Sequence, residues 1–190
     1  MTEVPQTSPL ADPDLPLIRA IGAGDKAALS ELYTRHGQGI LAYLIGQLGG
    51  NSQQAEEVLQ DVMLAVWKGA GSFRGESKVR TWMLGIARYQ VLSARRRRKP
   101  TPAELGDYIP ADEDGPQRVQ ERNEQRATVR AALRELPEDQ QEALELIFFH
   151  DLSGPEAADV LGVPPGTVKS RVHRAKNNLR GILQREEVDR

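Results

Sequence analysis

The sequence predicts an all-α protein with two small helical domains joined by a flexible linker. Apolar residues recur at helical spacing along most of the chain, and no segment shows credible strand alternation. An acidic, proline-containing stretch over residues 100–120 separates the two helical parts. With 190 residues, of which 39% are apolar, the chain can form two small cores.

Composition excludes several classes of protein. The absence of cysteine excludes disulfides, thiolate zinc sites and cysteine nucleophiles. The three histidines, His36, His150 and His173, are dispersed, so we expect no metal site and no cofactor. Apolar runs such as residues 40–45 are far shorter than the roughly 18 residues of a spanning helix. The N-terminus lacks a signal-peptide pattern, and we therefore expect a cytoplasmic protein.

The N-terminal domain is predicted over residues 14–99, after a disordered segment of residues 1–13 that is rich in proline. Asp25 can cap a helix that runs to about His36, and a second helix is predicted over residues 38–48. A glycine pair then breaks the chain, and Ser52 can cap a helix over about residues 53–69.

The helix predicted over residues 53–69 has two different faces. One face is a core stripe made of Ala55, Val58, Leu59, Val62 and Val66. The opposite face combines acidic and polar side chains with Leu64 and Trp67. Acidic groups beside apolar ones on an outward face indicate a protein-binding surface. The alternative is that another helix of the same domain covers Leu64 and Trp67.

A glycine-containing loop leads into a helix predicted from about Lys78 to Arg98. Aromatic residues alternate with arginines in this segment, and residues 95–99 are all basic. Such a pattern suits single-stranded DNA, because bases stack on aromatic rings while arginines neutralise phosphates. The alternative is that Trp82 belongs to the core together with Met83 and Ile86, and that the basic run is a solvated helix end.

The C-terminal domain is predicted over residues 121–185, followed by a tail of residues 186–190. Its helices resume near Glu121, a Leu-Pro pair at residues 136–137 interrupts them, and the next helix covers residues 138–149.

Residues 152–179 have the pattern of a helix-turn-helix. Ser153 and Glu156 can form a capping box at the start of the first helix, and Gly162 supplies the turn. Pro164 and Pro165 can begin the second helix, which places Thr167 in its first turn.

The second helix of this pair has an apolar stripe and a basic outer face. The stripe consists of Val168, Val172, Ala175, Leu179 and Ile182. Residues 163–185 contain no acidic residue. Basic side chains reach phosphates and base edges, so this pattern predicts a helix that reads duplex DNA in the major groove. The alternative is an ordinary amphipathic helix with a solvated basic face.

Three segments resemble the extracytoplasmic-function (group 4) sigma factors of bacterial RNA polymerase. Residues 55–67 resemble the core-polymerase-binding segment of region 2, and residues 73–88 resemble its promoter-melting segment. Residues 136–144 and 166–175 resemble region 4. The chain departs from the family pattern at Tyr89, where the family often has Asn, and at residues 154–155, where Gly-Pro follows Leu-Ser.

The resemblance implies partners and residue roles. Binding to the clamp helices of the largest polymerase subunit is assigned to Glu56, Glu57, Gln60, Asp61, Leu64 and Trp67. Capture of the minus-ten element is assigned to Phe73, Arg74, Ser77, Lys78, Arg80, Trp82, Arg88, Tyr89, Arg95 and Arg96. Duplex reading of the minus-thirty-five element is assigned to Thr167, Lys169, Ser170, Arg171, His173, Arg174, Lys176 and Asn177.

The resemblance further implies that region 4 touches the flap of the second-largest subunit and that the acidic linker threads toward the active-site cleft. It implies promoter DNA as a partner in both duplex and single-stranded form. Many members of the family are held by an anti-sigma factor, so we expect one here. No catalytic residue is expected, because bond chemistry belongs to the polymerase.

Two other functions share some of these sequence features. A two-component-type regulator ends in a similar helix-turn-helix, but it carries a receiver domain of alternating strands and helices, which the sequence lacks. An enzyme acting on nucleic acid needs a preorganised carboxylate or histidine cluster. We expect Asp12, Asp14 and the linker acids to lie in flexible segments, which are a poor setting for such a cluster.

Overall fold

The computed structural model describes residues 12–97, 132–133 and 135–188, with side chains up to residue 185. The chain divides into two compact units, residues 1–108 and 109–190, and each is described by itself. The described residues are helical and contain no strand, which confirms the all-α fold class. Of the segment predicted to be disordered over residues 1–13, residues 1–11 lie outside the described residues. The linker predicted over residues 100–120 and the helix start near Glu121 lie outside them as well.

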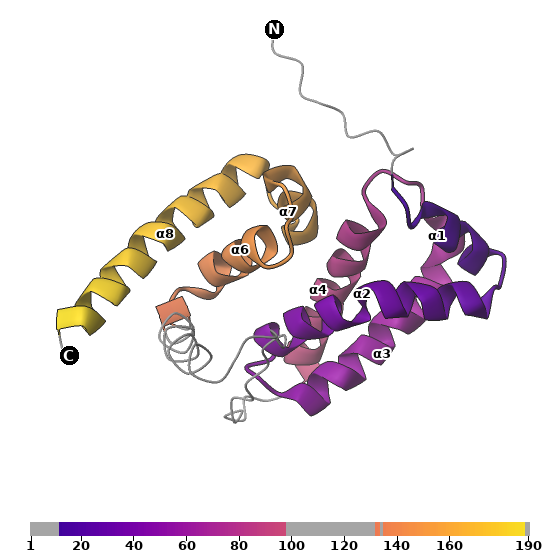
Figure 1. The fold of residues 1–190 in the computed structure, drawn as a ribbon, viewed down its shortest axis with the longest axis horizontal. Helices are drawn as coiled ribbons and strands as arrows, with labels where there is room; N and C mark the ends of the chain where they lie inside the picture. Colours follow the sequence, from indigo (N-terminus) through magenta and orange to yellow (C-terminus); the bar gives the residue numbers. More distant parts are fainter. Residues whose placement is uncertain (1–11, 98–131, 134, 189–190) are drawn as a thin grey trace, which may run out of the picture. The chain divides into compact units, whose positions relative to one another are not determined.

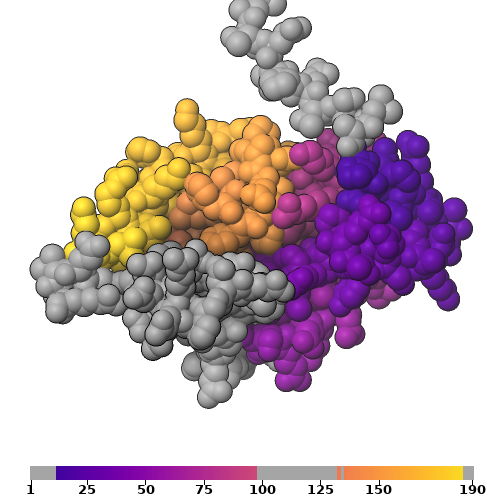
Figure 2. Space-filling model, viewed as in Figure 1, coloured from indigo at the N-terminus to yellow at the C-terminus, as the bar shows by residue number. Residues whose placement is uncertain are grey.

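Unit 1 is a bundle of four α-helices and one short 3₁₀ helix (Figure 1). These elements are α1 (Leu15–Gly22), α2 (Lys26–Gln47), α3 (Ser52–Gly69), η2 (Ala70–Ser72) and α4 (Val79–Arg97). Helices α2, α3 and α4 contact one another, and α1 contacts α2 and η2. The core includes Tyr43, Leu44, Val62 and Met83, all fully buried. In the space-filling view the atoms of this unit are closely packed on the visible face (Figure 2).

Helix α2 is one continuous helix, so the prediction of two helices over residues 25–36 and 38–48 is wrong. The helix passes through Gly37, whose backbone lies against the ring of Tyr33: an added Cβ would be 3.1 Å from the ring carbon Cδ2. A glycine inside a helix costs only about 1 kcal/mol. Burial of Leu32 and Ile40, on either side of Gly37, outweighs that cost.

The starts of α2 and α3 are set by side-chain acceptors. The predicted cap of α2 is confirmed, since the Asp25 carboxylate accepts from the backbone amides of Ala27 and Ala28. Helix α3 begins one residue earlier than predicted, because Asn51 rather than Ser52 caps it. The Asn51 side-chain oxygen accepts from the Gln54 amide at 2.9 Å.

Unit 2 contains the predicted helix-turn-helix, formed by α7 (Gly154–Leu161) and α8 (Pro165–Val188), which follow α6 (Glu138–Phe148). The capping box is present: the Ser153 hydroxyl accepts from the Glu156 amide, and the Glu156 carboxylate accepts from the Ser153 amide at 2.8 Å. Gly162 ends α7 in the left-handed conformation, with φ at 65°. The chain therefore turns where the sequence predicted.

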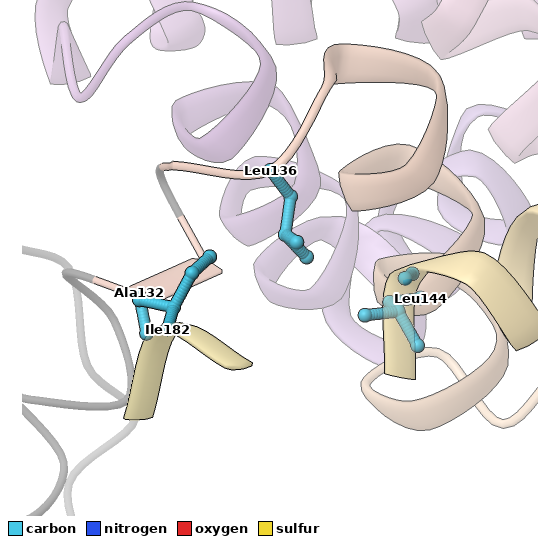
Figure 3. Close-up of a cluster of buried hydrophobic side chains, with 5 residues drawn as sticks. Ala132, Leu136, Leu144 and Ile182 are labelled. Atoms are coloured by element: carbon cyan, nitrogen blue, oxygen red, sulfur yellow. The ribbon is translucent and has the colours of Figure 1, made fainter. Parts of the chain in front are cut away.

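The core of unit 2 forms where α6 and the segment before it meet α8. Its buried cluster consists of Ala132, Leu136, Leu144, Ala175 and Ile182, of which four are labelled in Figure 3. Val172 and Leu179 pack against this cluster, and Val168 is also buried. The apolar stripe predicted for α8 is thus confirmed, and the opposite side of α8 remains available.

Replacing Gly162 with alanine should destabilise unit 2 by about 1 kcal/mol, because an L side chain disfavours the left-handed conformation. An added Cβ would meet no atom within 4 Å, so the effect isolates backbone strain. The matched control is Gly181→Ala in α8, which also has open space. It should stabilise the helix by up to about 1 kcal/mol. Urea denaturation followed by circular dichroism measures both, and a loss of stability in the control would contradict this account.

Candidate interaction surfaces

The outer face of α3 is acidic and apolar. Its buried side carries the predicted core stripe, while Glu56, Glu57, Gln60 and Asp61 are exposed. Leu64 is 50% exposed and Trp67 is half-buried. The alternative prediction, that another helix of the same domain covers both side chains, is therefore wrong for Leu64. It holds only in part for Trp67. Three carboxylates beside an exposed leucine suit a protein partner with basic and apolar side chains.

The loop before α4 contains a pair of aromatic rings. The ring centroids of Phe73 and Trp82 are 4.8 Å apart with an interplanar angle of 40°. Both side chains are half-buried, and Trp82 also lies against Gly69, where an added Cβ would be 3.2 Å from the ring. Trp82 is therefore neither a core residue like Met83, which is fully buried, nor a free surface ring. The exposed parts of both rings are available for stacking.

A cavity of about 480 Å³ lies between α1 and this loop. Its lining includes Ile18 and Arg19 from α1 together with Phe73, Arg74 and Gly75 from the loop, and it contains no acidic residue. Arg74 forms an exposed ion pair with Glu76, with Nε and Oε1 3.2 Å apart. Sequence reasoning did not include Arg19 among the candidates, because α1 carries no motif that indicates nucleic acid.

The remaining minus-ten candidates lie along the loop and α4. Ser77, Arg80 and Arg88 are half-buried, whereas Lys78 is exposed. Tyr89 is 63% exposed, and Arg95 and Arg96 are exposed near the end of α4.

Arg95 has a partner inside unit 1. Its guanidinium donates a hydrogen bond to the backbone carbonyl of Gln47, the last residue of α2. A cation at the end of a helix satisfies a free carbonyl and interacts favourably with the helix dipole. Arg95 is therefore not simply part of a solvated helix end, since it also stabilises the fold. Arg98 and Lys99 lie outside the described residues.

Asp12 and Asp14 are held by several hydrogen bonds, so the expectation that they lie in a flexible segment is wrong. Asp14 is buried, and its carboxylate oxygens lie 2.9 Å from Arg35 Nη1 and 2.6 Å from His36 Nε2. Asp12 accepts from the Val79 amide at 2.6 Å. Hydrogen bonds to Glu31 and to Asp14 raise the pKa of Arg35, so this guanidinium remains charged.

The outer face of α8 is polar and basic. Lys169, Ser170, His173, Arg174, Lys176 and Asn177 are exposed, while Thr167 and Arg171 are half-buried. The structure thus brings the predicted duplex-reading residues together on one helix. Arg174 has no carboxylate partner among the described residues, and its Nε donates only to the Ser170 carbonyl, at 3.4 Å.

Two of the α8 cations are engaged within unit 2. Arg171 Nε lies 3.1 Å from Asp139 Oδ2, which connects α8 to α6. Lys176 Nζ lies 4.9 Å from the centre of the Phe148 ring, as in a cation–π interaction. Arg174 is consequently the arginine of this face best placed to meet a new anion, whereas Arg171 holds two helices together.

The part of the chain that the structure describes contains no group of three metal-binding side chains. Within the same residues, no helix is both long enough and apolar enough to cross a membrane.

Two protein families match the chain: Sigma-70 region 2 over residues 32–101, and Sigma-70 region 4 over residues 126–179. The RNA polymerase sigma-H factor of Pseudomonas aeruginosa is 35% identical over 182 residues, covering 90% of this chain and 94% of that protein. The ECF RNA polymerase sigma factor SigM of Mycobacterium tuberculosis is 36% identical over 176 residues, covering 90% of this chain and 84% of that protein.

Solved structures show the same architecture. The sigma factor RpoE of Bartonella quintana, solved in complex with the anti-sigma factor NepR, matches with a TM-score of 0.64 and 27% identity, covering 82% of this chain and 96% of that one. CnrH in complex with the cytosolic domain of CnrY matches with a TM-score of 0.68 and 25% identity, covering 91% of this chain and 98% of that one.

Proposed function

The chain belongs to the Sigma-70 family, in its extracytoplasmic-function group, and we propose that its α8 face and α4 segment select promoters for core RNA polymerase. The observation that carries this proposal is the exposed face of α8, which is free of acidic residues up to residue 185. It follows the capped helix α7 and the left-handed turn at Gly162. A second helix in this setting is placed to enter the major groove, with its basic residues at phosphates and base edges.

Unit 2 reads the minus-thirty-five element as duplex in this proposal. Arg174 and Lys169 have exposed charges that can displace counterions from the DNA backbone. Ser170, His173 and Asn177 add hydrogen-bonding groups on the same face. His173 Nε2 and Asn177 Nδ2 are 3.2 Å apart, so these two side chains can act as one polar unit against a base pair.

Unit 1 captures the unpaired minus-ten strand. Phe73 and Trp82 provide neighbouring ring faces, and the same loop carries the exposed cations Arg74, which forms an exposed pair with Glu76, and Lys78. Stacking on an aromatic side chain is worth about 1–3 kcal/mol per base. Unpairing and unstacking a base costs a few kcal/mol. Capture of two or three bases would therefore offset much of the cost of local melting.

The polymerase is bound through the outer face of α3. Glu56, Glu57 and Asp61 offer exposed carboxylates, and Leu64 offers an exposed apolar side chain among them. This combination fits the clamp helices of the largest subunit if they present basic and apolar side chains. Region 4 would contact the flap of the second-largest subunit, and the acidic linker would follow the path toward the active-site cleft.

The protein contributes positioning and strand capture, and the polymerase performs the chemistry. We place its action in the cytoplasm, where the polymerase works. The Bartonella quintana relative was solved with an anti-sigma factor, and this supports control of the present chain by a partner of that kind. A two-component regulator is not favoured, because a Sigma-70 region 2 match precedes the helix-turn-helix.

Run-off transcription with core polymerase and a library of upstream sequences tests the whole proposal. The purified chain should confer site-selective starts, and the selected sequences should share two short elements separated by a spacer. Core polymerase without the chain is the control. Transcription that starts at the same positions with and without the chain would contradict the proposal.

Arg174→Ala should lower the affinity for promoter duplex by about tenfold, because it removes an exposed cation that pairs with no carboxylate among the described residues. If the contact is to a phosphate, the slope of log K against log salt should fall by about 0.9. The matched control is Arg171→Ala, which removes the ion pair with Asp139. It should cost at most about 1 kcal/mol of stability and leave the salt slope unchanged. Fluorescence anisotropy at several salt concentrations measures both, and equal losses in the two variants would contradict the assignment.

The double change Gln60→Ala and Asp61→Arg should weaken binding to core polymerase by at least about tenfold, because it reverses charge on the exposed face of α3. The control is Gln38→Arg, which adds a positive charge at an exposed position of α2. Biolayer interferometry with immobilised core enzyme measures the dissociation constants. Unchanged binding by the double variant would exclude this face as the polymerase contact.

A further inference from the structure

A hydrogen bond connects the segment before α1 with the first residue of α4, which lies 67 positions later in the chain. Asp12 Oδ2 accepts from the Val79 amide at 2.6 Å. Val79 is fully buried and is the first residue of α4, so its amide has no acceptor within the helix. A buried amide left without an acceptor is costly. The carboxylate of Asp12 thus satisfies a group that α4 cannot satisfy itself.

Asp12 is fixed by its own neighbours. Its other carboxylate oxygen accepts from the Asp14 amide at 3.0 Å, and its carbonyl accepts from the Leu15 amide at 3.2 Å. The Asp14 carboxylate in turn contacts Arg35 and His36 of α2. A chain of hydrogen bonds therefore runs from α2 through Asp14 and Asp12 to the start of α4.

Helix α1 also contacts the other end of the same loop. A Cβ added to Gly22 would lie 3.0 Å from Gly71 Cα, so the backbones of α1 and η2 touch. Residues 12–22 therefore contact both ends of the loop between η2 and α4: Gly22 lies against Gly71 of η2, and Asp12 accepts from Val79 of α4. Between these two points lie Phe73 and Arg74, which also line the cavity beside α1.

We propose that Asp12 is a positioning residue for promoter melting: by accepting the Val79 amide, it fixes where the loop of residues 73–78 enters α4. The loop then presents Phe73 beside Trp82 in one arrangement, with less freedom lost when a base is captured. This inference rests on the proposed function. The Sigma-70 region 2 match begins at residue 32, so it does not include Asp12 or α1.

The test compares Asp12→Ala, Asp12→Asn and Asp25→Ala with the unaltered chain, each bound to core polymerase on a promoter selected by run-off transcription. Asp12→Ala removes both acceptor oxygens, and Asp12→Asn keeps one oxygen that can serve the Val79 amide while the Asp14 amide loses its acceptor. Asp25→Ala is the matched control, because it removes an aspartate cap from α2 without touching α4. Permanganate reactivity measures the open complex, and hydrogen exchange measures protection of the Val79 amide.

Asp12→Ala should lower the open complex by about tenfold and accelerate exchange at Val79, because a hydrogen bond to a charged acceptor is lost. Binding to core polymerase should stay within about twofold, since α3 is unaltered. Asp12→Asn, which keeps one neutral acceptor, should form more open complex than Asp12→Ala and less than the unaltered chain. Asp25→Ala should form the open complex as the unaltered chain does. Measurements are made well below the melting temperature of every variant. If Asp12→Ala does not fold, Asp12→Ser, whose shorter side chain withdraws the acceptor, takes its place.

Two results would overturn the inference. One is a normal open complex in Asp12→Ala despite rapid exchange at Val79, which would show that the loop needs no such contact. The other is an equal loss in Asp25→Ala, which would show that general destabilisation is the cause. Failure of the proposed function looks different, because the unaltered chain would then give no site-selective starts at all.

Discussion

The structure depends on acceptors for the backbone amides at the beginnings of its helices. Four of the described helices begin on a side-chain oxygen: Asp25 for α2, Asn51 for α3, Asp12 for α4 and Ser153 for α7. Without such a partner a buried amide loses its hydrogen bond to water and gains nothing in return. Where each acceptor sits therefore decides where each helix starts, and hence which residues face outward from it.

Acceptors close in sequence to the amides they serve could be predicted from the sequence, whereas Asp12, the acceptor for Val79, could not. Asp25 and the pair of Ser153 and Glu156 lie within three residues of the amides they serve, so pattern alone finds them. Asn51 beside Ser52 shows the limit of that approach, because adjacent residues with equal capping ability differ only in backbone conformation. Asp12 is 67 residues from Val79, and only the folded chain brings the two together. The continuity of α2 likewise depends on packing, because burial of Leu32 and Ile40 on either side of Gly37 outweighs the cost of a glycine inside the helix.

Helical periodicity predicted which residues lie on outer faces, but it did not predict the contacts of individual side chains. Helical periodicity placed the acids of α3 and the cations of α8 on outer faces, because each faces away from a buried stripe. Periodicity carries no information about ion pairs and hydrogen bonds between helices. Arg171 meets Asp139 of α6, and Arg95 meets the end of α2, although both read in the sequence as free cations. Arg19 was missed because its neighbours in the cavity come from a loop more than fifty positions away.

Pairing divides the arginines of this chain into two kinds, and the division bears on how a protein with a net charge of −2 binds DNA. Arg35 and Arg171 pair with carboxylates inside their own unit, so much of their charge is already neutralised. Arg95 donates to a neutral carbonyl, so it connects α4 with α2 and keeps its charge. Arg174 keeps its charge exposed on a helix segment without acids. A polyanion is therefore attracted by the local field of one helix face, and the net charge of the chain matters little within a Debye length of about 8–10 Å. Some of the acids that balance these cations lie on the outer face of α3. Their negative charge suits a protein partner with basic side chains and repels DNA from that face.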